Sequence, residues 1–411
     1  MRVVLLVDTL AIGGLPNHVL DLARALSDAG ECVAVAHAGT DVPTHLDTRG
    51  IELLALADVG APLDAPRALA RLRQWQPDLV HVHLCSHLEL LLALSELRVP
   101  LVRSFHDYTS LCLRRGRRRY PGDRCARALG WSCALYGCLL GAPEPGQRLP
   151  RLANLPRKLS ERARYQHFDA ALVGSNHMGE VLRINGFAPE RITVVPYFSR
   201  FDREARGLAE MPEKPAGIPG VTRPLALMFA GQAVAGKGLE VLVRALPAMR
   251  GDWRLTAITS GPELERVRAL ARQLGVDARI EFIEWLPHEA LAGHYRRADL
   301  FVLPSVWDDP GPLVGIEAMS FATPVVAFAV GGIPDYVLHG RTGFLVAEVS
   351  VEALGGQLQR ALECGAGLAE LGRAGQALVV DRHGRSRHVN TIRSMYGHAA
   401  AARAMGLEAV T

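Results

Sequence analysis

The stretch LFVLPSVWDDPGPLVGIEAMSFATPVVAF, residues 300–328, decides the fold of this chain. The apolar runs at its two ends, Leu300–Leu303 and Val325–Phe328, have the length, the branched side chains and the flanking turn residues of buried parallel strands. The segment between them, Leu313–Phe321, has the pattern of a helix. The stretch therefore predicts a strand–helix–strand unit of a parallel sheet, with a long loop after the first strand.

That long loop, Pro304–Pro312, carries the first candidate site. In a parallel sheet, the loop after a strand and the start of the next helix face the ligand-binding edge. Asp309 lies in the loop and Glu317 lies one turn inside the helix. A helix N-terminus suits a diphosphate, and carboxylates suit the hydroxyls of sugars. The combination predicts a nucleotide-sugar site. On spacing alone an alternative is equally good: Asp309 is an ordinary loop acid, and Glu317 is an ordinary first-turn acid that interacts favourably with the helix dipole.

The run PSVWDDPGPLVGIEAM resembles the donor-site signature of the retaining glycosyltransferases of family four, also known as group 1, which have the GT-B fold. In that signature two acidic residues stand eight positions apart before an Ala-Met or Ala-Leu pair, and Asp309 and Glu317 have this spacing. The family usually has Glu first and a GFGLP-like run between, whereas here Gly311 lies between two prolines. Because proline has no N–H group, Gly311 and Leu313 remain as the backbone donors to phosphate.

Other segments of the second half resemble the same family. In LALMFAGQAVAGKGLEVLVRAL, the resemblance implies that Lys237 binds the donor diphosphate, helped by Gln232, which stands where relatives carry Arg. Loss of that charged contact would weaken stabilisation of the leaving group by about 1.5–3 kcal/mol. The turn at Gly261, the EWLP loop with Trp285 and the run GGIPDYVLHGRTGFLV from Gly331 continue the match. Relatives hold the nucleobase near the position of Trp285, although a core role explains this residue equally well.

Strand-like and helix-like segments also alternate in the first half, which predicts a second doubly wound domain. The predicted strands are Val3–Val7, Cys32–Ala36, Leu79–Leu84, Leu101–Phe105 and Ala170–Val173. Gly13 and Gly14 follow the first of them, and the resemblance implies that their N–H groups approach the donor diphosphate. His106 directly follows a strand and resembles the family histidine that approaches the donor sugar; a histidine that caps a strand end is the alternative. His81 and His83 lie on one face of a predicted strand. They are either metal ligands or a polar pair at the strand end.

Residues 111–148 look like an insertion with two unusual features. The first is a set of four cysteines without a CxxC spacing, which leaves zinc binding and disulfide formation open. These are Cys112, Cys125, Cys133 and Cys138. The second is the arginine-rich run Arg114–Arg119, which is either a solvated face or a surface that attracts an anionic acceptor or a membrane.

The composition is that of a soluble globular protein: 411 residues, 49% hydrophobic, 21% charged and a net charge of +4. This length predicts two domains, and the small net charge gives no reason to expect nucleic acid as a partner. The apolar run in MRVVLLVDTL is shorter than that of a secretory signal, and no uncharged run reaches the roughly 18 residues of a membrane span. A cytoplasmic location is expected, with peripheral contact at the inner face of the membrane through Arg114–Arg119.

The expected fold is α/β, with two doubly wound Rossmann-like domains facing a central cleft, as in GT-B proteins. Residues 1–202 are expected to form the acceptor-binding domain and residues 203–224 the linker. Residues 225–383 would bind the nucleotide sugar, and residues 384–411 would form a helix that returns to the first domain.

The resemblance implies transfer of a sugar from a nucleotide-diphosphate sugar to an acceptor hydroxyl, with retention of the anomeric configuration. The expected nucleotide is UDP or GDP. The acceptor is expected to be a glycan, a lipid-linked molecule or a small molecule. His106, Lys237 and Asp309 are the expected catalytic residues, and Glu317 the expected ribose ligand. No metal and no other cofactor is expected, because Lys237 and helix N-termini provide the positive charge. A catalytically silent protein that binds a nucleotide sugar or scaffolds a partner transferase is the main alternative, supported by Gln232; an epimerase on the same fold is a third.

Overall fold

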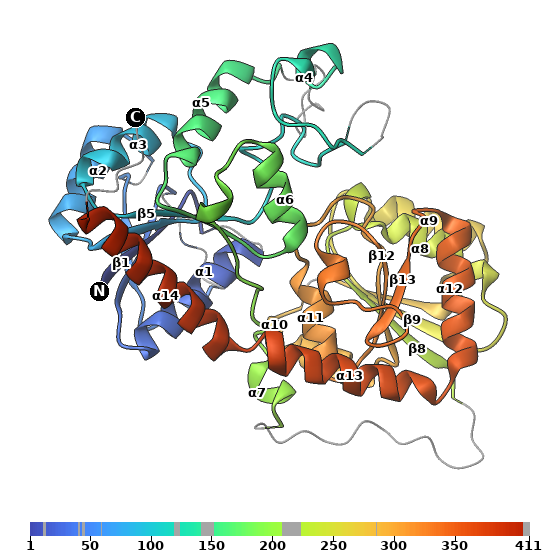
Figure 1. The fold of residues 1–411 in the computed structure, drawn as a ribbon. Helices are drawn as coiled ribbons and strands as arrows, with labels where there is room; N and C mark the ends of the chain where they lie inside the picture. Colours follow the sequence, from blue (N-terminus) through green and yellow to red (C-terminus); the bar gives the residue numbers. More distant parts are fainter. Residues whose placement is uncertain are drawn as a thin grey trace. The chain divides into compact units, whose positions relative to one another are not determined.

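A computed structural model describes residues 1–10, 14–39, 42, 46–58, 60–118, 124–140, 152–207, 223–284 and 286–405. The chain forms two compact units, each built on one parallel sheet (Figure 1). Unit 1 comprises Met1–Pro196 and Ser386–Thr411, and unit 2 comprises Tyr197–Arg385. None of the helices in the described ranges has both the length and the hydropathy of a membrane span.

Unit 1 has a seven-stranded sheet in the order β3-β2-β1-β4-β5-β6-β7. Its strands are β1 Arg2–Val7, β2 Cys32–His37, β3 Glu52–Ala55, β4 Leu79–Val82, β5 Leu101–Phe105, β6 Ala170–Val173 and β7 Ile192–Val194. Its helices are α1 Gly14–Asp28, α2 Ala65–Trp75, α3 Leu88–Ala93, α4 Ser132–Leu135, α5 Leu155–Gln166, α6 Asn176–Ile184 and α14 Arg385–Ala404, with 3-10 turns at Leu94–Leu97 and Pro189–Arg191. Asp64, Asn154 and Ser175 cap α2, α5 and α6 with their side chains, as N-cap residues of these types do.

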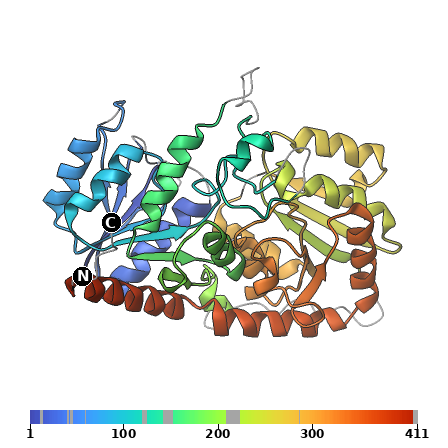
Figure 2. The same cartoon turned by 45° about the horizontal axis from the view of Figure 1, so that its top comes forward.

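Most strand residues of unit 1 are apolar on both faces because both faces are covered. Val3, Leu5 and Val7 of β1 pack with α1 and α14, whereas Val4 and Leu6 pack with α2, α3 and α6. In both views the last helix, drawn in dark red, lies alongside the blue α1 (Figures 1 and 2). The end of the chain therefore contributes to the core of unit 1.

Unit 2 has a six-stranded parallel sheet in the order β10-β9-β8-β11-β12-β13. Its strands are β8 Leu225–Ala230, β9 Trp253–Ile258, β10 Ile280–Ile283, β11 Leu300–Leu303, β12 Val325–Phe328 and β13 Gly343–Val346. Its helices are α7 Asp202–Ala205, α8 Leu239–Ala245, α9 Leu264–Gln273, α10 His288–Arg297, α11 Leu313–Ser320, α12 Val351–Cys364 and α13 Gly367–Arg382, with 3-10 turns at Ala235–Lys237, Leu246–Ala248, Asp277–Arg279 and Ile333–Asp335.

The two doubly wound sheets confirm the predicted fold class, and the strands at 300–303 and 325–328 have the predicted bounds. The division between the units falls at Pro196. The reason lies in the packing of the next residues on unit 2: the hydroxyls of Ser199 and Ser320 are 2.7 Å apart, and the rings of Phe201 and Phe321 are 4.8 Å apart. Residues 208–222 of the expected linker lie outside the described residues.

Candidate active site

The loops at the carboxyl ends of β8, β9, β11 and β12 meet at one edge of the unit 2 sheet. Strand order reverses direction at β8 and β11, where parallel α/β sheets usually bind ligands. Backbone hydrogen bonds fasten the loops to one another. They join Val306 N to Gly236 O (3.0 Å), Glu263 N to Ala233 O (3.1 Å) and Gly332 N to Asp309 O (2.8 Å).

Glycines allow these loops to approach so closely. Gly238 has φ +71°, and a Cβ there would lie 1.9 Å from the carbonyl oxygen of Pro304. Gly331 has φ +55°, and its Cβ would lie 2.0 Å from the carbonyl oxygen of Asp309. Only glycine combines a positive φ with such contacts at no steric cost. A Cβ on Gly261, another predicted site residue, would lie 2.9 Å from the carbonyl oxygen of Ala233.

Two of the predicted catalytic residues meet in this loop cluster. Nζ of Lys237 lies 2.6 Å from Oδ2 of Asp309, with the two side chains 35% and 17% exposed. The amide of Gly311 contacts Oδ1 of the same carboxylate at 3.4 Å. The ammonium group is thus held by a carboxylate, and an incoming diphosphate would compete with Asp309 for Lys237.

Glu317 lies on α11, the helix that follows the loop of Asp309, and this residue is 5% exposed. Oε2 accepts a hydrogen bond of 3.0 Å from the hydroxyl of Tyr295. Burial, followed by the charge of Glu317, raises the pKa of Tyr295 well above its ordinary value, so this hydroxyl remains a donor. A carboxylate accepts several hydrogen bonds, so the bond from Tyr295 does not by itself exclude a ligand hydroxyl.

The other predicted donor-site residues take varied positions. Gln232 is exposed, and Leu313 is the first residue of α11, whose N-cap has no side-chain hydrogen bond. A Cβ on Gly311 would lie 3.0 Å from the ring of Tyr197. Gly14 is the first residue of α1 in unit 1. Gly13 and Trp285 lie outside the described residues.

Two buried tyrosines support the site and were not predicted from the sequence. Tyr295 holds Glu317, and the hydroxyl of Tyr336 donates to the carbonyl oxygen of Pro312 at 3.1 Å. Both belong to the hydrophobic core of unit 2. An aromatic residue in an amphipathic or apolar segment is usually a core residue, so the sequence carried no signal for either hydroxyl.

In unit 1, His106 belongs to a cluster of histidines at the ends of β4 and β5. Nε2 of His106 lies 2.9 Å from Nδ1 of His83. The ring of His81 lies 4.1 Å from that of His83, and its nitrogens contact the hydroxyls of Tyr396 (2.7 Å) and Ser104 (2.8 Å). His81 and His83 therefore form a polar pair on one strand face, and α14 supplies one of the hydrogen-bonding groups.

The histidine cluster is neutral at pH 7. Burial, followed by the positive charges of Arg103 and the neighbouring histidines, lowers the pKa of His81 well below 6.5. The pKa values of His83 and His106 are lowered in the same direction, again mainly by burial. His18 and His388 lie beside the cluster. The ring centroid of His18 is 5.3 Å from that of His106 and 5.7 Å from that of His388.

We expect acid to destabilise the protein through this cluster. Because the folded-state pKa values lie below 6.5, the unfolded chain binds protons first as the pH falls. Stability is thus complete above pH 6.5 and is lost below it, by about 1.4 kcal/mol per pH unit for each histidine. Urea denaturation at pH 7.5 and 5.5 measures the loss. A His81→Gln variant should lose less stability between the two pH values than the wild type does. A variant of the exposed His398 should lose as much stability as the wild type. Equal stability of the wild type at the two pH values would contradict the prediction.

The described residues contain no group of three or more His, Cys, Asp or Glu side chains that is placed to hold a metal ion. All seven cysteines are free thiols, so no disulfide joins the four cysteines of the insertion. Burial raises the pKa of the thiols of Cys112 and Cys138. These two cysteines are therefore protonated at neutral pH.

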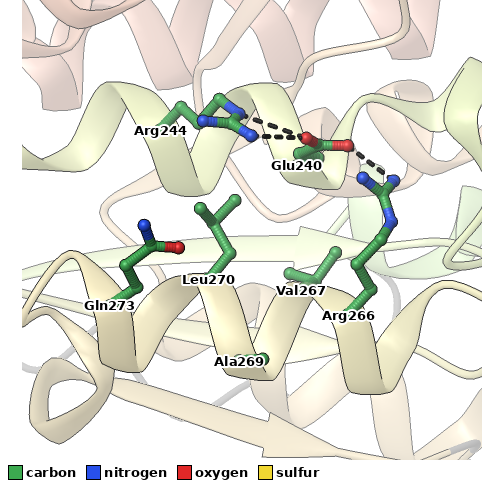
Figure 3. Close-up of a pocket in the computed structure, with 7 residues that line it drawn as sticks. All are labelled: Glu240, Arg244, Arg266, Val267, Ala269, Leu270 and Gln273. Atoms are coloured by element: carbon green, nitrogen blue, oxygen red, sulfur yellow. Dashed lines mark hydrogen bonds and ion pairs between the residues drawn. The ribbon is translucent and has the colours of Figure 1, made fainter.

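A surface hollow of about 220 Å³ lies between α8 and α9 of unit 2 (Figure 3). Glu240 contacts Arg244 at 2.9 Å and Arg266 at 2.6 Å, so the two guanidinium groups are already paired. None of its lining residues belongs to the loop cluster. Its volume is below the roughly 300–1,000 Å³ of ordinary ligand pockets, and we assign it no function.

Comparison with known proteins gives the family. The family model described as Glycosyltransferase Family 4 matches residues 12–198, and the model described as Glycosyl transferases group 1 matches residues 213–377. Among solved structures, Anabaena Alr3699/HepE in complex with UDP has a TM-score of 0.72 at 17% identity, covering 97% of this chain and 100% of that chain. Sucrose-phosphate synthase from Thermosynechococcus elongatus has a TM-score of 0.69 at 22% identity, covering 98% and 99%.

Curated relatives are similar in sequence over part or most of the chain. A GDP-mannose-dependent alpha-(1-6)-phosphatidylinositol monomannoside mannosyltransferase of Mycolicibacterium smegmatis is 29% identical over 59% of this chain and 61% of its own length. A D-inositol 3-phosphate glycosyltransferase of Corynebacterium glutamicum is 32% identical over 46% of this chain and 48% of its own length. A D-inositol 3-phosphate glycosyltransferase 2 of Catenulispora acidiphila is 28% identical over 82% of this chain and 78% of its own length. This chain belongs to the group 1 glycosyltransferases of family four and has the GT-B fold.

Proposed function

We propose that this protein transfers a sugar from a nucleotide-diphosphate sugar to an acceptor hydroxyl, with retention of the anomeric configuration. The observation that carries the proposal is the pair of Lys237 and Asp309 at the meeting point of four loops, beside the N-terminus of α11. A cation and a helix N-terminus suit a diphosphate, and a carboxylate next to them suits sugar hydroxyls. Family membership supports the same function.

The proposed roles follow from these contacts. Lys237 leaves Asp309 to bind the diphosphate, with the exposed Gln232 as a second donor. Asp309 then accepts hydrogen bonds from sugar hydroxyls, and Glu317, held by Tyr295, binds the ribose. From the resemblance, we propose that His106 contacts the edge of the reacting sugar.

In the proposed reaction, the acceptor oxygen forms a bond to the anomeric carbon on the face that the diphosphate leaves. The bond from that carbon to the diphosphate oxygen breaks, and the departing diphosphate takes the proton of the acceptor hydroxyl. Negative charge grows on the leaving group, where Lys237 stabilises it. We propose that no metal ion or further cofactor takes part, so that transfer continues in the presence of EDTA.

The base of the donor is proposed to be uracil or guanine. One relative is named as GDP-mannose-dependent, and Alr3699/HepE has been solved with UDP and with UDP-glucose. A ligand that binds only the folded state raises the melting temperature. We expect UDP- or GDP-sugars to do so, with ADP- and TDP-sugars as controls, and Lys237→Ala and Glu317→Gln to reduce the shift. No shift with any donor would contradict the proposal.

The catalytically silent alternative is distinguished by the same preparation. Gln232 in the position of the usual Arg is the feature that favours it. Binding of a donor without transfer to glycan, lipid-linked or small-molecule acceptors would support it. Interconversion of the donor sugar without an acceptor would instead indicate an epimerase.

We further propose a cytoplasmic enzyme that contacts the inner face of the membrane through the insertion. Trp131 and Leu135 are 70% and 87% exposed there, which is unusual for large apolar side chains. The arginine-rich run lies in the same insertion; Arg119 at its end lies outside the described residues. Within that run Arg115 is exposed and Arg114 and Arg118 are partly exposed, whereas Arg117 is buried, so only the first three are available to an anionic lipid surface.

We therefore expect the protein to sediment with anionic phospholipid vesicles and not with neutral ones. Each arginine near the surface contributes about 1 kcal/mol of attraction, which salt weakens. A Trp131→Ser, Leu135→Ser double variant should bind several-fold less. Leu92→Ser removes an exposed leucine outside the insertion and should bind like the wild type. Equal sedimentation of the double variant and the wild type would exclude this surface.

A further inference from the structure

The contact between His83 and His106 determines which nitrogen of His106 carries hydrogen. Nδ1 of His83 lies 2.9 Å from Nε2 of His106, with the ring planes 13° apart and the centroids 5.1 Å apart. This is the arrangement expected when an N–H of one ring points at an in-plane lone pair of the other. Both rings are neutral, so each has one N–H and one lone pair, and one ring donates to the other.

The second nitrogen of His83 shows which ring donates. Nε2 of His83 is buried, and no hydrogen-bond partner lies within reach of it among the described residues. If His106 donated, the single hydrogen of His83 would be on Nε2, as a buried N–H without an acceptor. If His83 donates, Nε2 has only an unused lone pair. Buried orphan N–H groups are rarer than unsatisfied acceptors in native proteins, so His83 is the donor.

The surroundings of His83 maintain this arrangement. His83 is 1% exposed, and its backbone N–H donates to the carbonyl oxygen of Leu6 at 2.8 Å. His81 packs against its ring at 4.1 Å, while both nitrogens of His81 are occupied by Tyr396 and Ser104. His81 therefore fixes the ring of His83 without competing for the hydrogen on Nδ1.

We propose that His83 is a positioning residue that holds His106 in the tautomer with hydrogen on Nδ1, so that His106 meets its ligand as a neutral hydrogen-bond donor. Nε2 of His106 is then occupied as an acceptor and is not available to abstract a proton from an acceptor hydroxyl. The proposal deepens the proposed function and rests on it for the identity of the ligand. A sugar hydroxyl or ring oxygen is the kind of group that a neutral N–H would bind.

The tautomer is measured directly by two-bond ¹H–¹⁵N spectra of protein labelled with ¹⁵N-histidine at pH 7.5, with a His106→Gln variant to assign the signals. In the wild type we expect a protonated, pyrrole-type Nδ1 and an unprotonated, pyridine-type Nε2 for His106. His83→Asn keeps an amide N–H near the position of Nδ1 and should preserve this tautomer. His83→Leu has no donor, and His106 should shift toward the Nε2–H form that free histidine favours in water.

Transfer kinetics give a second measure. His83→Leu should lower kcat about tenfold or more with little change in donor KM, and His83→Asn should restore most of it. An Nε2–H tautomer in the wild type, or an unchanged tautomer in His83→Leu, would overturn the proposal. If His83→Leu does not fold, the wild-type and His83→Asn spectra still decide. The spectra do not depend on turnover, so an inactive protein with the expected tautomer would contradict the proposed function and leave the role of His83 in place.

Discussion

Replacement of Lys237 by Met is expected to slow sugar transfer by about 10²- to 10³-fold, the usual effect of removing one group that stabilises developing negative charge. Methionine keeps much of the apolar length of the side chain and removes only the ammonium group. The Lys237 side chain is 35% exposed, so the fold should be little affected. Steady-state kcat/KM with the donor identified by thermal shift measures the effect.

The ion pair with Asp309 provides the control for this prediction. Lys237→Met leaves the Asp309 carboxylate, 17% exposed, without its 2.6 Å partner, and this could by itself repel a diphosphate. A Lys237→Met, Asp309→Asn double variant removes that repulsion. If Lys237 stabilises the leaving group, the double variant is slower than Asp309→Asn alone by about the same factor that separates Lys237→Met from the wild type. A double variant as fast as Asp309→Asn alone would show instead that the unpaired carboxylate caused the loss.

The loop cluster of unit 2 was largely predictable because parallel strands covered on both faces appear as continuous apolar runs. The runs at 300–303 and 325–328 gave the strands, and these placed Asp309 in the loop at the carboxyl end of the first of them. The ion pair was not predicted, because Lys237 and Asp309 are 72 residues apart in sequence. Local spacing identifies the loops that each strand produces but not the side chains that meet when the loops converge.

Burial of polar groups was the least predictable property of both units. Glu317 was expected to be the ribose ligand, with an ordinary first-turn acid as the alternative, and neither interpretation indicated its burial against Tyr295, 22 residues away. In unit 1, the period of two placed His81 and His83 on one face, yet the hydroxyl that holds His81 comes from Tyr396, 315 residues later. Such contacts depend on which helix covers which face of a sheet, and sequence periodicity does not contain that information.

Replacement of Gly331 by Ala is expected to lower the free energy of unfolding of unit 2 by about 2–5 kcal/mol, from about 1–2 kcal/mol for the left-handed backbone and about 1–3 kcal/mol for overpacking. The Cβ would lie 2.0 Å from the carbonyl oxygen of Asp309, a backbone atom that cannot rotate away. The same oxygen accepts the 2.8 Å hydrogen bond from Gly332 N, so Asp309 must move and donor binding should weaken too.

Gly340→Ala is the matched control, because Gly340 has φ +70° in the same unit and nothing lies within 4 Å of a Cβ there. It should lose only the backbone contribution, about 1–2 kcal/mol, and keep its affinity for the donor. Urea denaturation and donor titration of the two variants separate the effects. Equal destabilisation of both, with donor binding intact in Gly331→Ala, would show that the loop at Gly331 can relax without moving Asp309. A larger loss in Gly331→Ala together with weaker donor binding would show that this glycine holds the carboxylate in place.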